Sequence, residues 1–209
     1  SHGGIHTGTD GSSAQSIEDL AIYRTIPGMA VIHPSDDLSA EELTVQLLDY
    51  SSASYMRTAR NKTPRMYNEE TVRELRIGKG SQIRDGSDVC IIACGVMVNE
   101  AMIAAETLTS EGISASVIDM HTLKPLDTNL IEQCITRCGC LVTAEDHSVI
   151  GGLGGAVAEY LATTKPAPLE MVGVSDKFGQ SGSSSDLMHA MGLTADDIVA
   201  AAQRSISRK

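Results

Sequence analysis

The sequence predicts an α/β fold with three layers, in which helices cover both faces of parallel sheets. From residue 88 onward, short apolar runs typical of strands buried on both faces alternate with segments of helical length. Residues 29–58 show the same alternation once, as a β-α-β unit. Aromatic residues make up only 3% of the chain, so aliphatic side chains must fill the core, which suits helices packed on a parallel sheet.

The first 75 residues predict an incomplete α/β domain. Ser39 and Glu42 have the spacing of a capping box, and Pro27 ends the preceding helix. We expect this domain to lack its first strand, which would lie upstream. The expected elements are a Gly/Ser/Thr-rich loop at 1–12, a helix at 17–24, a strand at 29–33, a helix at 39–50 and a strand at 54–58.

A polar, charged stretch at residues 61–85 interrupts the hydrophobic pattern and indicates a linker with one short strand. The chain is therefore expected to divide into a partial domain at 1–75, a linker at 76–87 and a second domain at 88–209.

The second domain predicts four strands and four helices in alternation, which implies parallel strands with right-handed crossovers. Asp127 stands at the start of one helix, and Thr194 caps the closing helix. The expected elements are strands at 88–93, 115–119, 140–143 and 169–174, and helices at 98–109, 127–137, 153–163 and 194–207.

The charge and the cysteine content narrow the function classes. A formal net charge of −11 repels polyanions, so we expect no nucleic acid partner and no membrane, and no apolar run is long enough to span a bilayer. The five cysteines include no C-x-x-C pair and no histidine at ligand spacing. They predict reduced, buried thiols in a cytoplasmic protein and no metal site.

Two segments have the composition of a binding site. The glycine-rich segment Gly3 to Gly11 allows a ligand to approach the backbone closely, although Asp10-Gly11 also suits an ordinary turn. Arg57 and Arg60 follow a predicted strand at its carboxyl end, where ligands of open α/β sheets collect. An arginine there matches the geometry of a phosphate, and the alternative is a solvated surface side chain.

Other polar motifs are interpreted as structural. Glu145-Asp-His147 could be an acid–base cluster, but without a nucleophile nearby it indicates an ordered turn. Gly151-Gly-Leu-Gly-Gly155 matches no phosphate-loop pattern and indicates close packing of a helix start against the sheet. His33, His121 and His189 have no convincing partners and are expected in structural or surface positions.

The order of several strings is specific. Gly8-Thr-Asp-Gly11, Ile17-Glu-Asp-Leu-Ala-Ile-Tyr-Arg24 and Arg57-Thr-Ala-Arg60 resemble the second half of the pyrimidine-binding domain of transketolases. Asp119-Met-His-Thr-Leu-Lys-Pro-Leu-Asp127 and Asp176-Lys-Phe-Gly-Gln-Ser-Gly182 resemble the family's C-terminal domain. The last string is more similar to split, two-subunit transketolases than to single-chain ones.

The resemblance implies transfer of a two-carbon ketol unit between sugar phosphates, with thiamine diphosphate and Mg²⁺ as cofactors of the complete enzyme. By position, His2 and Arg60 match residues that hold the substrate phosphate, with Arg57 a weaker candidate beside Arg60. Asp10 matches the residue that binds the aldose C2 hydroxyl. Gln15 is a possible cofactor contact.

Two positions depart from the family pattern. Ala14 stands where many relatives have His or Gln, and Gln15 could replace that side chain only if the loop shifts. Thr9 replaces the acid before the family's Asp. Both departures bear on donor specificity and rate.

The resemblance also implies what other parts of the enzyme supply. The carboxylate that activates the cofactor and the Mg²⁺ ligands lie upstream in this family, so no catalytic residue and no metal site is expected in this chain. We expect the isolated chain to be inactive and to bind no cofactor alone. It would need an N-terminal transketolase section or subunit, and a homodimer would cover apolar surface that the incomplete domain exposes.

Four other functions remain open. The chain could belong to a related 1-deoxyxylulose-5-phosphate synthase or to a β-type subunit of a 2-oxo acid dehydrogenase. It could also be a non-catalytic assembly or binding subunit in which Ala14 reflects lost chemistry. A nucleotide-binding regulator built on the Gly151 loop is the weakest of these alternatives.

Overall fold

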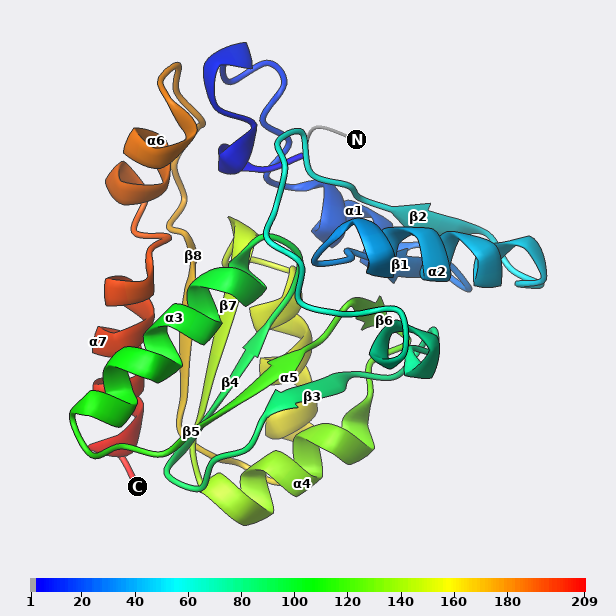
Figure 1. Ribbon diagram of the computed structural model, residues 1–209. Helices are drawn as coiled ribbons and strands as arrows, with labels where there is room; N and C mark the ends of the chain where they lie inside the picture. The colour runs from blue at the N-terminus through cyan, green and yellow to red at the C-terminus, as the bar shows by residue number, and fades with distance from the viewer. Residues whose placement is uncertain (1–2) are drawn as a thin grey trace.

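The computed structural model describes residues 3–209, which form two sheets and the helices around them (Figure 1). The larger sheet has the strand order β3-β5-β4-β7-β8, and the smaller has the order β2-β1-β6. The three-layer α/β class predicted from the sequence is confirmed.

The larger sheet belongs to the C-terminal part of the chain. Strands β4, β5, β7 and β8 are parallel, and β3 pairs with β5 in the antiparallel direction at one edge. Its elements are β3 (Ser81–Arg84), β4 (Val89–Ala93), α3 (Met97–Ser110), β5 (Ala115–Asp119), α4 (Thr128–Cys138), β7 (Leu141–Ser148), α5 (Leu153–Thr163), β8 (Leu169–Val174), α6 (Ser184–Ala190) and α7 (Ala195–Ile206).

Two hydrophobic cores lie on opposite faces of this sheet. Val89, Ile91 and Ala93 of β4 point into a core that α3 and α7 cover. Cys90 and Ile92 point into the other core, which α4 and α5 cover. The apolar run of β4 is continuous because this central strand is buried on both faces.

The smaller sheet combines strands from both parts of the chain. Strand β1 (Ala30–Ile32) pairs in parallel with β2 (Ser54–Met56) and in the antiparallel direction with β6 (Thr122–Lys124). The last of these follows β5 after a two-residue break. The other elements of this region are η1 (Ile5–Asp10), α1 (Asp19–Thr25), α2 (Asp37–Leu48) and η2 (Thr71–Glu74).

Several sequence expectations need correction. Helix α2 begins earlier than expected because Asp36 is its N-cap and Ser39 is the N3 residue of the capping box. Residues 1–12 contain η1 instead of only a loop. By contrast, the short strand expected in the polar stretch 61–85 is present as β3, and it pairs within the larger sheet. Strand β7 continues to Ser148, so the Glu145 motif lies in a strand and not in a turn.

The expectations for the cysteines and for two helix caps are confirmed. All five cysteines are free and buried. Asp127 and Thr194 cap α4 and α7 through hydrogen bonds from Leu130 N and Asp197 N. Among residues 3–209, no helix has both the length and the apolar character that a bilayer crossing requires. Exposed apolar side chains occur on the N-terminal helices, at Ile22 of α1 and at Val45 and Leu48 of α2.

Candidate functional site

The glycine-rich loop, defined here as residues 3–11, folds over the carboxyl end of β7. Gly4 has φ of +88°, and a Cβ at Gly3 or Gly4 would overlap the Arg57 guanidinium. At Gly4 such an atom would also overlap the carboxylate of Asp146. Glycine is therefore required at these two positions because the backbone lies directly on a buried ion pair.

Asp10 and Arg60, two of the predicted substrate-binding residues, form an ion pair in the structure. Arg60 Nε donates to Asp10 Oδ2 at 2.8 Å, and both side chains are partly exposed, at 44% for Arg60 and 35% for Asp10. Next to this pair, Asn61 Nδ2 donates to His6 O at 2.7 Å. The segment after β2 is thus joined to η1 at two consecutive residues. His2, the expected partner of Arg60, lies outside the described residues.

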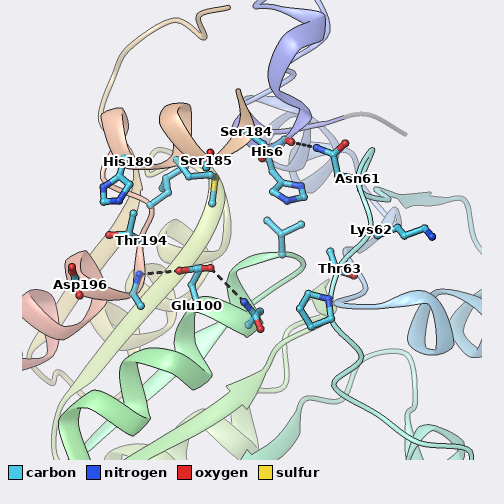
Figure 2. Close-up of a pocket in the computed structure, with 16 residues that line it drawn as sticks. His6, Asn61, Lys62, Thr63, Glu100, Ser184, Ser185, His189, Thr194 and Asp196 are labelled. Carbon is cyan, nitrogen blue, oxygen red and sulfur yellow. Dashed lines mark hydrogen bonds between the residues drawn. The ribbon is translucent and has the colours of Figure 1, made fainter. Parts of the chain in front are cut away.

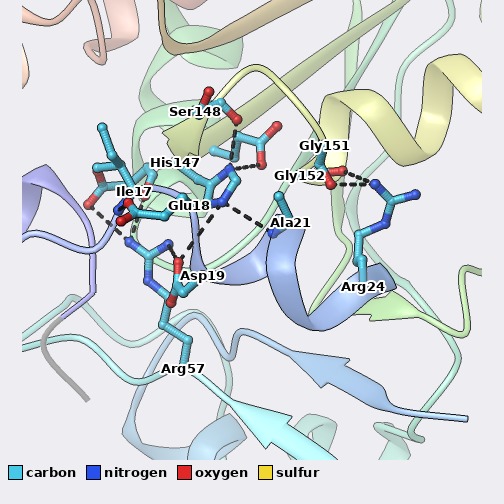
Figure 3. A network of polar contacts seen from close by, with 12 residues as sticks. Ile17, Glu18, Asp19, Ala21, Arg24, Arg57, His147, Ser148, Gly151 and Gly152 are labelled. Atoms are coloured by element: carbon cyan, nitrogen blue, oxygen red, sulfur yellow. Dashed lines mark hydrogen bonds and ion pairs between the residues drawn. The ribbon is translucent and has the colours of Figure 1, made fainter. Parts of the chain in front are cut away.

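Arg57, the weaker phosphate candidate, is buried and its guanidinium is already bound (Figure 3). Nη2 donates to Asp146 O at 2.6 Å, and Nη1 donates to Asp19 Oδ1 at 3.3 Å. The side chain is only 1% exposed, so a phosphate could reach it only if these bonds opened. The contact with substrate therefore stays a prediction, and Arg60 is the better placed of the two arginines.

The motif Glu145-Asp-His147 is completely buried at the end of β7. Glu145 accepts hydrogen bonds from Leu153 N at 2.7 Å and Gly154 N at 2.8 Å, at the start of α5. Burial raises the pKa of the Glu145 carboxyl, although His147 and these two backbone N–H groups act in the opposite direction. The start of α5 packs closely on the sheet, as predicted, because a Cβ at Gly154 in its first turn would lie 2.8 Å from Met171 Sδ.

Gln15, the possible cofactor contact, is buried under the loop. Its Nε2 donates to Gly8 O and to Gln180 O, each at 2.9 Å. A cofactor contact through this nitrogen would require the loss of one of these bonds.

Asp119 is a buried carboxyl between the two sheets. Its Oδ2 accepts hydrogen bonds from Ser35 Oγ at 2.7 Å and from Tyr67 OH at 2.8 Å. Burial raises the pKa of Asp119 to about 7, although both hydroxyl donors act in the opposite direction. Burial lowers the pKa of His121 to about 4 and also lowers the pKa of His33, so both stay neutral at pH 7.

A cavity of about 640 Å³ lies between the two parts of the chain (Figure 2). It is large enough for a small ligand. Its wall brings Glu100 and Asp196 opposite Lys62, and burial lowers the pKa of His6, so the lining has no excess of positive charge. A second cavity, of about 450 Å³, lies beyond the carboxyl ends of β1 and β2 and includes Lys62 and Arg65.

Thiamine diphosphate in this family implies a metal ion at the diphosphate. Among the described residues, no three His, Cys, Asp or Glu side chains lie close enough together to hold such an ion.

Comparison with protein families gives two matches. Residues 78–198 match the profile described as "Transketolase, C-terminal domain". Residues 1–66 match "Transketolase, pyrimidine binding domain".

Curated relatives include single subunits and longer chains. The chain is 42% identical over 206 residues to the 6-deoxy-6-sulfo-D-fructose transketolase subunit of Clostridium sp. (strain MSTE9), covering 99% of this chain and 63% of that protein. It is 41% identical over 198 residues to a "Putative transketolase C-terminal section" of Methanocaldococcus jannaschii, covering 94% of this chain and 62% of that protein. It is 33% identical over 209 residues to 1-deoxy-D-xylulose-5-phosphate synthase 1 of Geobacter sulfurreducens, covering 99% and 33%. The chain thus spans less than two thirds of each relative.

A solved structure described as "Split gene transketolase, inactive beta4 tetramer" superposes with a TM-score of 0.90 at 40% identity. The match covers 97% of this chain and 66% of that one.

Proposed function

The chain belongs to the transketolase family, and we propose that it is the substrate-side section of an enzyme that transfers a ketol unit between sugar phosphates. The observation that carries this proposal is the ion pair between Asp10 and Arg60, two residues 50 positions apart in sequence. If these sequence motifs resembled the family only by chance, there would be no reason for Asp10 of the glycine-rich loop and Arg60 of the segment after β2 to be in contact.

In this proposal Arg60 binds the phosphate of the sugar. The bond to Asp10 uses Nε, and among the described residues Arg60 makes no other hydrogen bond, so its terminal nitrogens are available. These nitrogens form the planar pair of donors that matches two phosphate oxygens. Lys62 is close in sequence and exposed, which adds positive charge to a chain that is acidic as a whole.

Asp10 in this proposal accepts a hydrogen bond from the aldose C2 hydroxyl, which would favour one stereoisomer. The ion pair fixes the Asp10 carboxylate against Arg60, so both groups would face the same sugar phosphate. His2 would complete the phosphate site from the residue before the described loop.

The cofactor, thiamine diphosphate, would supply the nucleophilic carbon and the electron sink for the cleaved bond. We propose that an N-terminal transketolase section supplies the activating carboxylate and the metal ligands. The isolated chain is then inactive. Exposed Ile22, Val45 and Leu48 are apolar surface that this partner, or a second copy of the chain, would cover.

A mixing experiment tests the proposal. The chain alone, an N-terminal transketolase section alone and the mixture are each assayed with Mg²⁺, thiamine diphosphate, xylulose 5-phosphate and ribose 5-phosphate. We expect ketol transfer only in the mixture. Clear turnover by the chain alone, or none in a mixture that forms a stable complex, would overturn the proposal.

A second candidate function is 1-deoxyxylulose-5-phosphate synthesis, because a synthase of that name aligns with the whole chain at 33% identity. Replacing the ketose phosphate by pyruvate and ribose 5-phosphate by glyceraldehyde 3-phosphate distinguishes the two, because pyruvate loses CO2 and its remaining two carbons join the three-carbon acceptor to give the five-carbon product. Product from pyruvate and none from the ketose phosphate would favour the synthase.

A further inference from the structure

Asp146 lies where the larger sheet meets the glycine-rich loop. Its side chain is 1% exposed, and it accepts hydrogen bonds from Ile5 N at 2.7 Å and from His6 N at 3.0 Å. These are the first two N–H groups of η1, which has no side-chain cap within its own segment. The carboxylate of Asp146, in the C-terminal part of the chain, therefore accepts the hydrogen bonds of the first two N–H groups of η1.

The Asp146 carboxylate is itself held from the opposite side. Arg57 donates to the backbone oxygen of Asp146, and its Nη2 lies 3.9 Å from Asp146 Oδ2. Arg57 is fixed in turn by Asp19 of α1. The carboxylate therefore has little freedom to move without opening a buried ion pair.

Three consecutive residues of β7 bind the segment that runs from the loop into α1. Asp146 binds the start of η1, His147 Nε2 accepts from Ala21 N at 3.3 Å, and Ser148 N donates to Ile17 O at 2.8 Å. The register between β7 and β8 shifts between Ala144 and Ser148. The regular pairing of β7 with β8 is thus interrupted at the residues of β7 that bind the N-terminal segment.

We propose that Asp146 is the positioning residue of the glycine-rich loop, which it holds so that Asp10 faces Arg60. The loop is short: Asp146 fixes its first turn, Asn61 binds His6 O in the middle, and Asp10 is the last residue of η1. We infer that a displacement of the first turn reaches Asp10 through Gly8, where η1 is kinked with φ of +75°. The effect on substrate rests on the proposed function, whereas the effect on the loop does not.

The variant Asp146→Asn tests the proposal. It keeps the size of the side chain but replaces one acceptor oxygen by an N–H₂ group that faces a backbone donor. In the isolated chain we expect hydrogen exchange at the Ile5 and His6 amides to become at least about tenfold faster. In the reconstituted enzyme we expect KM for the phosphorylated acceptor to rise about tenfold with little change in kcat.

Glu145→Gln is the matched control. This neighbouring carboxylate is equally buried and also accepts two backbone N–H bonds, but these come from α5. We expect this control to lower the stability of the chain while leaving loop exchange and KM at the wild-type values. Equal changes of both quantities in the two variants would show only general destabilisation and would overturn the proposal.

Unchanged exchange at Ile5 and His6 in Asp146→Asn would also overturn it. Should this variant fail to fold, Asp146→Glu keeps the charge and displaces the carboxylate by one methylene. We then expect faster exchange at the same two amides, and wild-type exchange would contradict the proposal. If the wild-type mixture transfers no ketol unit, the proposed function fails, while the exchange data still decide whether Asp146 holds the loop.

Discussion

The two sheets of this protein differ in which part of the chain supplies the strands and side chains that hold them in place. Helices that follow its own strands cover both faces of the five-stranded sheet, and most residues of its two cores come from the C-terminal part, although Ile5, Leu20 and Val31 also contribute. The three-stranded sheet takes β6 from the C-terminal part, and the glycine-rich loop beside it is bound by Asp146 and Gln180. The region that carries the proposed substrate contacts therefore depends on the region that does not.

The largest expected effect comes from breaking the buried ion pair that joins the two regions. Arg57→Met leaves the Asp146 and Asp19 carboxylates buried without their cation, so we expect the free energy of unfolding to fall by about 3–5 kcal/mol. Denaturant titration measures it. The control Arg65→Met removes an exposed pair with Asp37 and should cause no measurable change. Equal losses in the two variants would show that the regions are not joined through Arg57.

The second effect concerns the buried Asp119 between the two sheets. Because its pKa in the folded protein is about 7 instead of 3.8, the unfolded chain loses this proton near pH 4 while the folded chain keeps it until about pH 7. The free energy of unfolding should therefore fall, on the order of 4 kcal/mol, as the pH rises between these values, and should level off above pH 7.

Asp119→Asn removes this titration while keeping an oxygen for Ser35 and Tyr67. We expect the difference in unfolding free energy between wild type and variant to change across the window from pH 4 to pH 7. A difference that is constant with pH would show that the carboxyl ionises normally, so that the contact between the sheets is more hydrated than the burial of Asp119 indicates.

A smaller effect is expected within the C-terminal region. Thr194→Ala removes the side-chain cap of α7, and we expect a loss of about 1 kcal/mol in denaturant titrations. Exchange at the Ile5 and His6 amides should remain as in the wild type, because α7 makes no hydrogen bond to the glycine-rich loop among the described residues. A faster loop in this variant would contradict the account that the C-terminal part holds the loop through Asp146 and Gln180.

The sequence allowed prediction of the five-stranded sheet but not of the contacts between regions. The apolar composition of a run such as Val89–Ala93 indicates directly that the strand is buried. Helix caps such as Asp127 and Thr194 are also visible in the sequence, because they accept hydrogen bonds from residues only three positions away. Strand β6 has three residues with two polar side chains, so it carries no strand pattern of its own. It forms because β1 offers an edge to pair with.

In the candidate site too, contacts between segments far apart in the chain could not be predicted from local sequence patterns. The resemblance indicated Asp10 and Arg60, which the structure places in contact. Asp146 was interpreted as part of an ordered turn, because its partners, Ile5 N and His6 N, lie 140 or more residues away. Two consecutive acidic residues at the end of an apolar run are the available signal, and only the fold shows that each carboxylate binds a different backbone segment.

The pair of Asp10 and Arg60 is tested most directly by the acceptor preference of the reconstituted enzyme. KM is measured for a phosphorylated aldose and for the same aldose without phosphate, in the wild type, in Arg60→Ala and in the control Arg65→Ala. We expect Arg60→Ala to raise KM for the phosphorylated acceptor about 10–100-fold and to leave the other nearly unchanged, because the lost bonds are to phosphate. Equal changes for both acceptors, or none for either, would contradict the phosphate site.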